Sequence, residues 1–148
     1  MSKIRLTKEF RFEAAHALLG YDGLCKNIHG HSYILRVTVK GRPLEDDKSP
    51  KYGMVMDFSD LKKIVNEQIV NRFDHSIILN KKVPHTSFKN VEDMFERIHL
   101  LDYQPTCENM LVDFVERIKQ QIPAEIELFS VQLYETATSF AEWFAEDN

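Results

Sequence analysis

Three histidines with strand-like spacing are the residues of this chain best suited to chemistry. His16 shares the even positions of segment 4–16 with mostly apolar residues, and His29 and His31 share the odd positions of segment 29–41 with another apolar set. Side chains two residues apart on a strand lie on one face about 6.6 Å apart, and paired strands lie about 4.8 Å apart. We therefore expect the three imidazoles to converge on one inward face.

Three neutral imidazoles are typical ligands of a metal ion, each about 2.0 to 2.1 Å from a bound zinc. Zinc suits such a set best, although cobalt, nickel and iron are compatible with the same ligand type. A single inward histidine is usually an ordinary core residue, so the prediction depends on all three together. The sequence predicts a Zn2+ site formed by His16, His29 and His31.

Cys25, on the loop between the two segments, determines which kind of metal site this is. If its thiolate ligates the ion, the site is tetrahedral and purely structural. If Cys25 does not bind the ion, the fourth coordination position is open to water or substrate. The nearby cation then lowers the thiol pKa below about 8.5, so that Cys25 is a general base. Its place outside the strand register favours the second case. Cys107 begins a helical pattern and is interpreted as small apolar filler.

Further carboxylates and one more histidine stand where chemistry is conceivable. Asp74 and His75 follow an apolar helical pattern, and a carboxylate beside an imidazole fixes its tautomer for proton transfer. The alternative is a plain helix C-terminus, where His75 favours the dipole. Glu108 lies in the first turn of another helical pattern, which also suits a carboxylate. Glu135 continues the inward register of Phe129, and a buried carboxylate needs a donor partner.

Strands, two helices and further strands must position these residues. Segments 4–16 and 29–41 read as antiparallel neighbours. Helical spacing predicts one helix ending at Phe73, capped by Asp57 or Ser59, and a second that opens at Pro105 and Thr106 and stops before Pro123. Late strands are expected over 129–135 and 139–144. A short extra helix is expected within 81–104, from the spacing of Val91, Met94, Phe95, Ile98 and Leu101. The pattern predicts an α+β domain.

Length and composition limit the remaining possibilities. The 148 residues fit one domain, 1–148, and the net charge of −4 without a basic stripe argues against a nucleic-acid partner. We find neither a signal-like start nor an apolar run of about 18 residues, so we expect no membrane association and a cytoplasmic location. The two cysteines are expected to be free thiols. An open sheet with exposed edges favours a homo-oligomer.

Five motifs follow one another along the chain: Phe12-Glu13-Ala14-Ala15-His16, Cys25-Lys26-Asn27-Ile28-His29-Gly30-His31, Asp74-His75, Pro105-Thr106-Cys107-Glu108-Asn109 and Tyr134-Glu135-Thr136. In this order and spacing they resemble the family of 6-pyruvoyl- and 6-carboxy-tetrahydropterin synthases. The resemblance covers nearly the whole chain. The three residues between Cys25 and His29 are similar to the carboxy-forming bacterial branch of queuosine biosynthesis, whereas pyruvoyl-forming members usually have a longer gap.

The resemblance implies the tunnelling fold, in which an antiparallel sheet with two main helices on one face forms trimers that close a barrel and pair into hexamers. It implies zinc at the three histidines and active sites between subunits. It also implies roles for six further residues. These are a proton-transfer set, Cys25, Asp74 and His75, and a pterin anchor, Glu108 and Glu135 with Thr106 nearby.

The implied reaction is that of a zinc-dependent carbon-carbon lyase. Dihydroneopterin triphosphate is converted into 6-carboxy-5,6,7,8-tetrahydropterin with release of acetaldehyde and triphosphate. Alternatives are 6-pyruvoyl-tetrahydropterin synthesis, a non-catalytic scaffold in which Cys25 closes the metal site, and a Cys-His hydrolase using Cys25 and His75. One departure is segment 81–104, which is longer than the family's compact form and is interpreted as decoration, a subunit contact or a lid.

Overall fold

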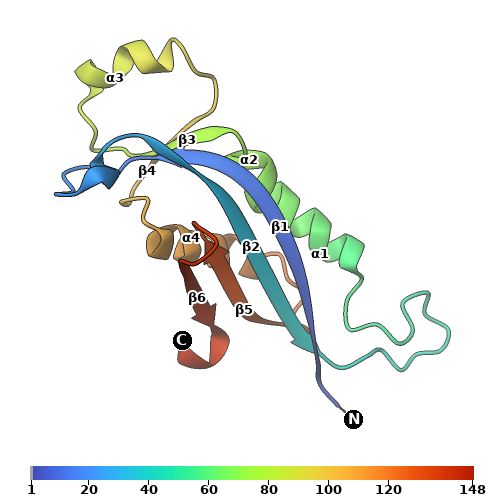
Figure 1. Cartoon of the computed structure of the whole chain (residues 1–148). Helices are drawn as coiled ribbons and strands as arrows, with labels where there is room; N and C mark the ends of the chain where they lie inside the picture. Colours follow the sequence, from blue (N-terminus) through green and yellow to red (C-terminus); the bar gives the residue numbers. More distant parts are fainter. Residues whose placement is uncertain (1) are drawn as a thin grey trace.

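A computed structural model describes residues 2–148 and shows one six-stranded sheet with strand order β4-β3-β1-β2-β5-β6 (Figure 1). The strands are β1 (Ile4–His16), β2 (His29–Gly41), β3 (Ser76–Asn80), β4 (Ile98–Leu101), β5 (Glu127–Tyr134) and β6 (Phe140–Phe144). The helices are α1 (Phe58–Val65), α2 (Asn71–Phe73), α3 (His85–Glu92) and α4 (Cys107–Lys119). A π-helical stretch, η2 (Asn66–Val70), joins α1 to α2, and the short 3-10 turns are η1 (Leu24–Lys26) and η3 (Ala145–Asp147). The α+β class and both long helices are confirmed.

The sheet is mixed, which corrects the expectation of a wholly antiparallel sheet. β1, β2, β5 and β6 pair antiparallel, but β3 runs parallel to β1, and β4 runs parallel to β3. The continuous helix from α1 to α2 explains the direction of β3. After β2, sixteen helical residues at about 1.5 Å each run back along the sheet in the direction of β1. The next strand, β3, keeps this direction and therefore pairs parallel with the end of β1, from Ala14 onwards.

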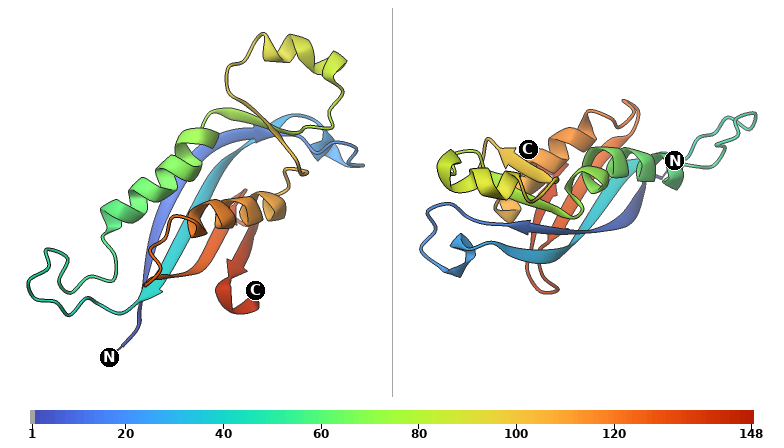
Figure 2. Two further views of the ribbon diagram at one scale, coloured as in Figure 1. Left: turned by 180° about the vertical axis from the view of Figure 1, so that it is seen from behind. Right: turned by 90° about the horizontal axis from the view of Figure 1, so that it is seen from above.

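Both main helices pack on the same face of the sheet, as expected (Figure 2). The even positions of β1 and the odd positions of β2 face them, so that the rings of Phe12 and Tyr33 stack at 4.9 Å and Phe114 of α4 meets Phe12 edge-on at 6.1 Å. Leu61 and Ile69 complete the same core from the first helix. Asp57 caps that helix by accepting a hydrogen bond from the Ser59 amide at 2.8 Å. The period-2 prediction for the long hairpin is confirmed.

A β-bulge overturns the predicted inward position of Phe129. The register of β2 against β5 shifts between Thr38 and Val39, so Leu128 enters the core instead. An extra residue in one strand reverses which face the following side chains take. The Phe129 ring packs under the Arg5 guanidinium, whose central carbon lies 4.0 Å from the ring centroid.

The helix-free face of the sheet is polar in composition. Arg36 donates to Glu9 at 2.9 Å and lies over the Tyr134 ring at 4.9 Å, while Thr7 and Thr38 share a hydrogen bond at 2.8 Å. Cations also cover the aromatic rings of this face, including those of Phe129 and Tyr134. The sheet still ends in the strands β4 and β6. Within residues 2–148, none of the helices has the length and apolar character needed to span a membrane.

Segment 81–104 contains a helix and a strand, so the predicted short helix was placed wrongly. The helix α3 ends at Glu92, and Ile98 and Leu101 belong to β4. Both residues were assigned to the helix because a few apolar side chains fit either period. Val91, near the C-terminal end of α3, packs in a small cluster with Ala17 and Leu79, and the helix otherwise stands away from the main body (Figure 1).

Candidate functional site

The three predicted histidines converge where β1 ends and β2 begins. In the antiparallel register His16 pairs with His29 and Ala14 pairs with His31, which places all three imidazoles on the core-side face. The Nε2 atom of His16 lies 3.0 Å from Nε2 of His29 and 3.1 Å from Nε2 of His31. Among residues 2–148 these three form the group of side chains that could hold a metal ion. We call them the imidazole trio.

The second ring nitrogens show why the trio suits a cation. Nδ1 of His16 donates to the Pro105 carbonyl at 2.7 Å, and Nδ1 of His29 donates to the Asn27 carbonyl at 2.8 Å. A neutral imidazole that donates from Nδ1 has only a lone pair at Nε2, and two lone pairs cannot hydrogen-bond to each other. Tetrahedral zinc with bonds of about 2.05 Å requires ligand nitrogens about 3.3 Å apart, close to the observed spacing.

Burial keeps His16 and His31 in the protonation state that binds metals. His16 is 2% exposed, and its burial, together with the neighbouring imidazoles, lowers its pKa to about 4 despite the opposing effect of the Pro105 carbonyl. Burial also lowers the pKa of His31, against the pull of Glu135. Both rings are therefore neutral at neutral pH, and neutral imidazole is the form that ligates metals.

Glu135 reaches the trio from the end of β5. Its Oε1 lies 3.7 Å from Nε2 of His16, and its side chain is 24% exposed, so the carboxylate is half-buried beside the trio. Its backbone amide is held by the Ser139 carbonyl at 3.1 Å. The predicted inward direction of this side chain is thus found, and a carboxylate so placed is able to accept hydrogen bonds from a ligand.

The start of α4 contacts the trio through the Pro105 carbonyl. Thr106 is the N-cap and accepts from the Asn109 amide at 3.2 Å, and the preceding Pro105 carbonyl holds His16. Glu108, in the first turn, is exposed. Thr106 therefore has a visible structural role, and the pterin-binding roles of Thr106 and Glu108 stay predictions.

Cys25 lies in the η1 turn, partly buried, outside the trio. Its carbonyl accepts from the Leu18 amide at 2.9 Å, which ties the loop together near the end of β1. The sulfur is thus not grouped with the imidazoles as a fourth ligand, which favours the open rather than the closed kind of metal site. Its role as a general base stays a prediction.

Asp74 and His75 form the predicted pair, but at a different place from the trio. Oδ2 of Asp74 lies 3.0 Å from Nδ1 of His75, and Oδ1 accepts from the Glu13 amide at 2.8 Å. Partial burial raises the pKa of Asp74, but the hydrogen bonds from Glu13 and His75 outweigh it and the net pKa is lowered. Asp74 is also the C-cap of α2, so the helix-end interpretation and the pair are both found.

The backbone of His75 is unusual. Its φ of +57° lies in the left-handed region, which costs a residue other than glycine free energy, and residues in such strained conformations cluster at active sites and ligand-binding sites. The side chain is 75% exposed, and its amide donates to the Glu13 carbonyl at 2.6 Å. We call Asp74 and His75 the proton-transfer pair.

Sequence reasoning missed two parts of the site. The Pro105 carbonyl orients His16, yet a backbone oxygen leaves no signal in side-chain patterns. Tyr33 lies beneath the trio, with its ring centroid 5.4 Å from that of His31, and its buried hydroxyl has no hydrogen-bond partner among residues 2–148. The inward register of Tyr33, two residues after His31, was the available signal for this second contact.

Comparison with known proteins places this geometry in a family. The family description "6-pyruvoyl tetrahydropterin synthase" matches residues 5–146. The 6-carboxy-5,6,7,8-tetrahydropterin synthase of Haemophilus influenzae is 33% identical over 143 residues, which cover 94% of this chain and 97% of that protein. The Synechocystis protein of the same name is 34% identical over 139 residues, covering 93% and 91%.

Solved structures agree on the fold. The 6-pyruvoyl tetrahydropterin synthase of Caenorhabditis elegans superposes with a TM-score of 0.68 at 24% identity, covering 98% of this chain and 97% of that one. An uncharacterized protein from Wolinella succinogenes superposes with a TM-score of 0.77 at 20% identity, covering 98% and 99%. These likenesses confirm the α+β fold that the resemblance implies for one chain, while its assembly into trimers and hexamers stays a prediction. The match over residues 5–146 and the 33% identity to the Haemophilus protein show that the chain belongs to the 6-pyruvoyl tetrahydropterin synthase family.

Proposed function

We propose that this protein is a zinc-dependent lyase that converts dihydroneopterin triphosphate and one water molecule into 6-carboxy-5,6,7,8-tetrahydropterin, acetaldehyde and triphosphate, as a step of queuosine biosynthesis. The observation that carries the proposal is the set of Nε2 atoms 3.0 and 3.1 Å apart, with two of the Nδ1 groups donating to backbone carbonyls. Curated relatives named for this product support the choice of reaction.

The imidazole trio would hold the zinc ion. When bound, zinc supplies a Lewis acid that polarises oxygen atoms of the substrate side chain and so favours loss of the neighbouring protons. The chain itself contributes the orientation of the ligands: the Pro105 and Asn27 carbonyls fix the rings of His16 and His29. Such partners of ligand histidines typically change metal affinity 10- to 100-fold, roughly, when removed.

Glu135 would hold the pterin ring. A pterin presents two parallel N–H donors on one edge, which match the two oxygens of a carboxylate. Because Glu135 lies 3.7 Å from His16, a ring bound there places its side chain beside the trio. Glu108 and Thr106, at the start of α4, would complete the anchor.

Cys25 and the proton-transfer pair would move the protons. Cys25 as thiolate removes one from the substrate side chain, and His75, held by Asp74 at 3.0 Å, transfers another. The exposed His75 makes no contact with the trio of its own chain within residues 2–148, so the pair would serve a neighbouring copy in a homo-oligomer. The exposure of His75 supports the proposal that the active site lies between subunits.

Product analysis tests the proposed reaction. Purified protein is incubated with dihydroneopterin triphosphate, and the products are identified by mass spectrometry with a coupled acetaldehyde assay. Acetaldehyde and the carboxy product support the proposal. A pyruvoyl product without acetaldehyde would assign the chain to the other branch of the family, whose name several structural neighbours carry.

Metal removal distinguishes an enzyme from a metal-stabilised scaffold. Chelation of a catalytic ion abolishes turnover and leaves the far-ultraviolet circular dichroism unchanged, because the extensive core packs around α1 and α4 without it. Unfolding on chelation, with no turnover before it, would instead identify a scaffold. Restoration of activity by one zinc per chain completes the test.

A further inference from the structure

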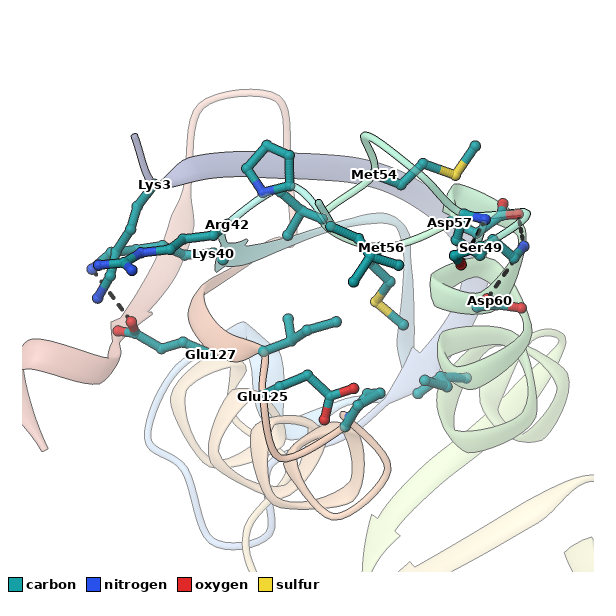
Figure 3. Close-up of a pocket in the computed structure, with 18 of the residues that line it drawn as sticks. Lys3, Lys40, Arg42, Ser49, Met54, Met56, Asp57, Asp60, Glu125 and Glu127 are labelled. Atoms are coloured by element: carbon teal, nitrogen blue, oxygen red, sulfur yellow. Dashed lines mark hydrogen bonds and ion pairs between the residues drawn. The ribbon is translucent and has the colours of Figure 1, made fainter. Parts of the chain in front are cut away.

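A second cavity lies at the opposite end of the β1–β2 hairpin from the imidazole trio. Its volume is about 990 Å³, at the upper end of the range of roughly 300 to 1,000 Å³ that is typical of small-molecule sites. It lies between the loop of residues 42–57, the start of α1 and the connection from α4 to β5 (Figure 3). Lys40 is nine residues from His31 along β2, which puts the cavity about 30 Å from the trio of the same chain.

One side of this cavity is cationic. Lys3, Lys40 and Arg42 gather there, and Figure 3 shows their nitrogen ends close together. We call them the basic wall. Glu127 pairs with Lys40 at 3.3 Å, but among residues 2–148 no carboxylate lies within ion-pair distance of Lys3 or Arg42. Three cations against one carboxylate favour an anion, and the planar guanidinium of Arg42 matches phosphate oxygens.

The floor of the cavity is apolar. Met56 is 8% exposed and points between the two sides in Figure 3, and Met54, Ile64 and Ile126 also line the cavity. Methionine side chains are flexible and polarizable, and they pack well against flat rings. A ligand whose anionic group meets the basic wall would therefore lay a planar apolar body across this floor.

The carboxylate available to the other end of such a ligand lies between the two sides of the cavity. Lys51 is already paired with Asp57 and with Asp60, the latter at 3.8 Å, so these groups satisfy one another. Glu125 lies between the two sides in Figure 3 and makes no hydrogen bond or ion pair among the described residues. Its carboxylate would accept two adjacent N–H donors, an edge that guanine has and adenine lacks.

We propose that this cavity binds a phosphorylated planar heterocycle with two adjacent N–H donors, the chemistry of a guanine nucleotide. The phosphate meets the basic wall, the ring lies on the methionines, and the N–H edge meets Glu125. A pterin phosphate has the same chemistry. The site is separate from the metal centre and independent of the reaction proposed there.

Calorimetric titration of the full-length protein with guanosine monophosphate tests this inference. We expect saturable binding that Arg42→Gln and Glu125→Gln each weaken about tenfold. Lys48→Gln is the matched control, because it removes a charge from the same loop outside the cavity, and should change the affinity less than about twofold. Glu135→Gln, at the metal centre, should leave the affinity unchanged.

Three outcomes overturn the inference. The first is the absence of saturable binding at about 1 mM nucleotide, and the second is an affinity that Arg42→Gln and Glu125→Gln leave unchanged. The third is equal affinity for inorganic phosphate or adenosine monophosphate, which would mean that the site does not recognise the N–H edge of the ring. A parallel titration of Glu135→Gln with dihydroneopterin triphosphate identifies the source of the ligand. Tighter, Arg42-dependent binding than that of guanosine monophosphate would assign a pterin to the same site. Unchanged thermal unfolding of each variant shows that the fold is kept.

Discussion

The imidazole trio and the proton-transfer pair differ in how completely one chain builds them. His16 is 2% exposed, and its ring is held by a backbone carbonyl, so the metal centre is formed within a single chain. His75 is 75% exposed, adopts a φ of +57°, and has Asp74 as its side-chain partner. Under the proposed function, one half of the chemistry is preorganised by the fold, and the other half becomes functional only when a second copy approaches.

The largest loss of activity is expected when the imidazole trio loses one of its ligands. His31→Ala removes one of three ligands, so we expect the protein to lose its zinc and its activity to fall by about a thousandfold, since a bound metal contributes several kcal/mol to such a reaction. Metal content is measured by mass spectrometry and turnover by product formation.

The matched control is His99→Gln, outside the trio, which should keep one zinc per chain. His99 donates to the Arg72 carbonyl at 2.7 Å and packs on Phe73, so its role is local. Full zinc content in the His31→Ala protein would show that the trio is not the metal centre.

Loss of the proton-transfer pair should lower the activity without changing the zinc content. His75→Ala removes a proton-transfer group, for which we expect an activity loss of about 100-fold with unchanged zinc content. Asp74→Asn should also lower the activity, but by a smaller factor, because His75 remains.

Mixing the two defects then tests the division between copies. When His31→Ala and His75→Ala chains are co-expressed, a mixed oligomer contains some sites with an intact trio from one chain and an intact pair from another. We expect partial recovery of activity. If the pair acts on the trio of its own chain, no mixed site is intact and activity stays absent.

The same contrast explains what the sequence could predict. The trio, the long hairpin and Glu135 follow from strand periodicity, because alternation is local and a buried face is strongly specified. The pairing of Asp74 with His75 follows from adjacency. Sequence patterns therefore predicted the convergence of the imidazoles and the contact of Asp74 with His75, whereas the catalytic roles of these residues stay predictions.

The predictions from sequence that were wrong depended on contacts between residues far apart in the chain. The direction of β3 depends on how far the helix before it carries the chain, and the position of Phe129 depends on one bulge opposite Thr38. Ile98 and Leu101 fit a helix as well as a strand, and only pairing with β3 decides between them. The contact of Pro105 with His16 joins residues 89 positions apart through a backbone atom, which side-chain patterns do not encode.

The two cysteines provide a finer comparison between a reactive and an inert thiol. Burial, with Glu135 nearby, raises the pKa of Cys107 to about 12, and its sulfur donates to the Leu133 carbonyl at 3.2 Å. At pH 8 Cys107 is therefore a thiol, and its alkylation should become appreciable only as the pH rises towards 12. Iodoacetamide at pH 8 should modify Cys25 first and abolish activity.

The variants should follow the same order. Cys25→Ala is expected to lower activity about 100-fold, whereas Cys107→Ala should keep it within a few-fold. Peptide mapping identifies the alkylated residue. Preferential labelling of Cys107, or full activity of Cys25→Ala, would contradict the assignment of Cys25 as the base.

The smallest effect concerns the support of the trio by α4. Thr106 caps this helix, so Thr106→Ala should lower the free energy of unfolding by about 1 kcal/mol, and Thr106→Ser, which keeps the hydroxyl, should not. Because the neighbouring Pro105 carbonyl orients His16, fraying of the helix start should also weaken zinc binding by up to about tenfold. Denaturant titration and competition with a chelator measure the two effects. Equal stability and zinc affinity in both variants would mean that the helix start does not hold the metal centre, and that the strands alone preorganise it.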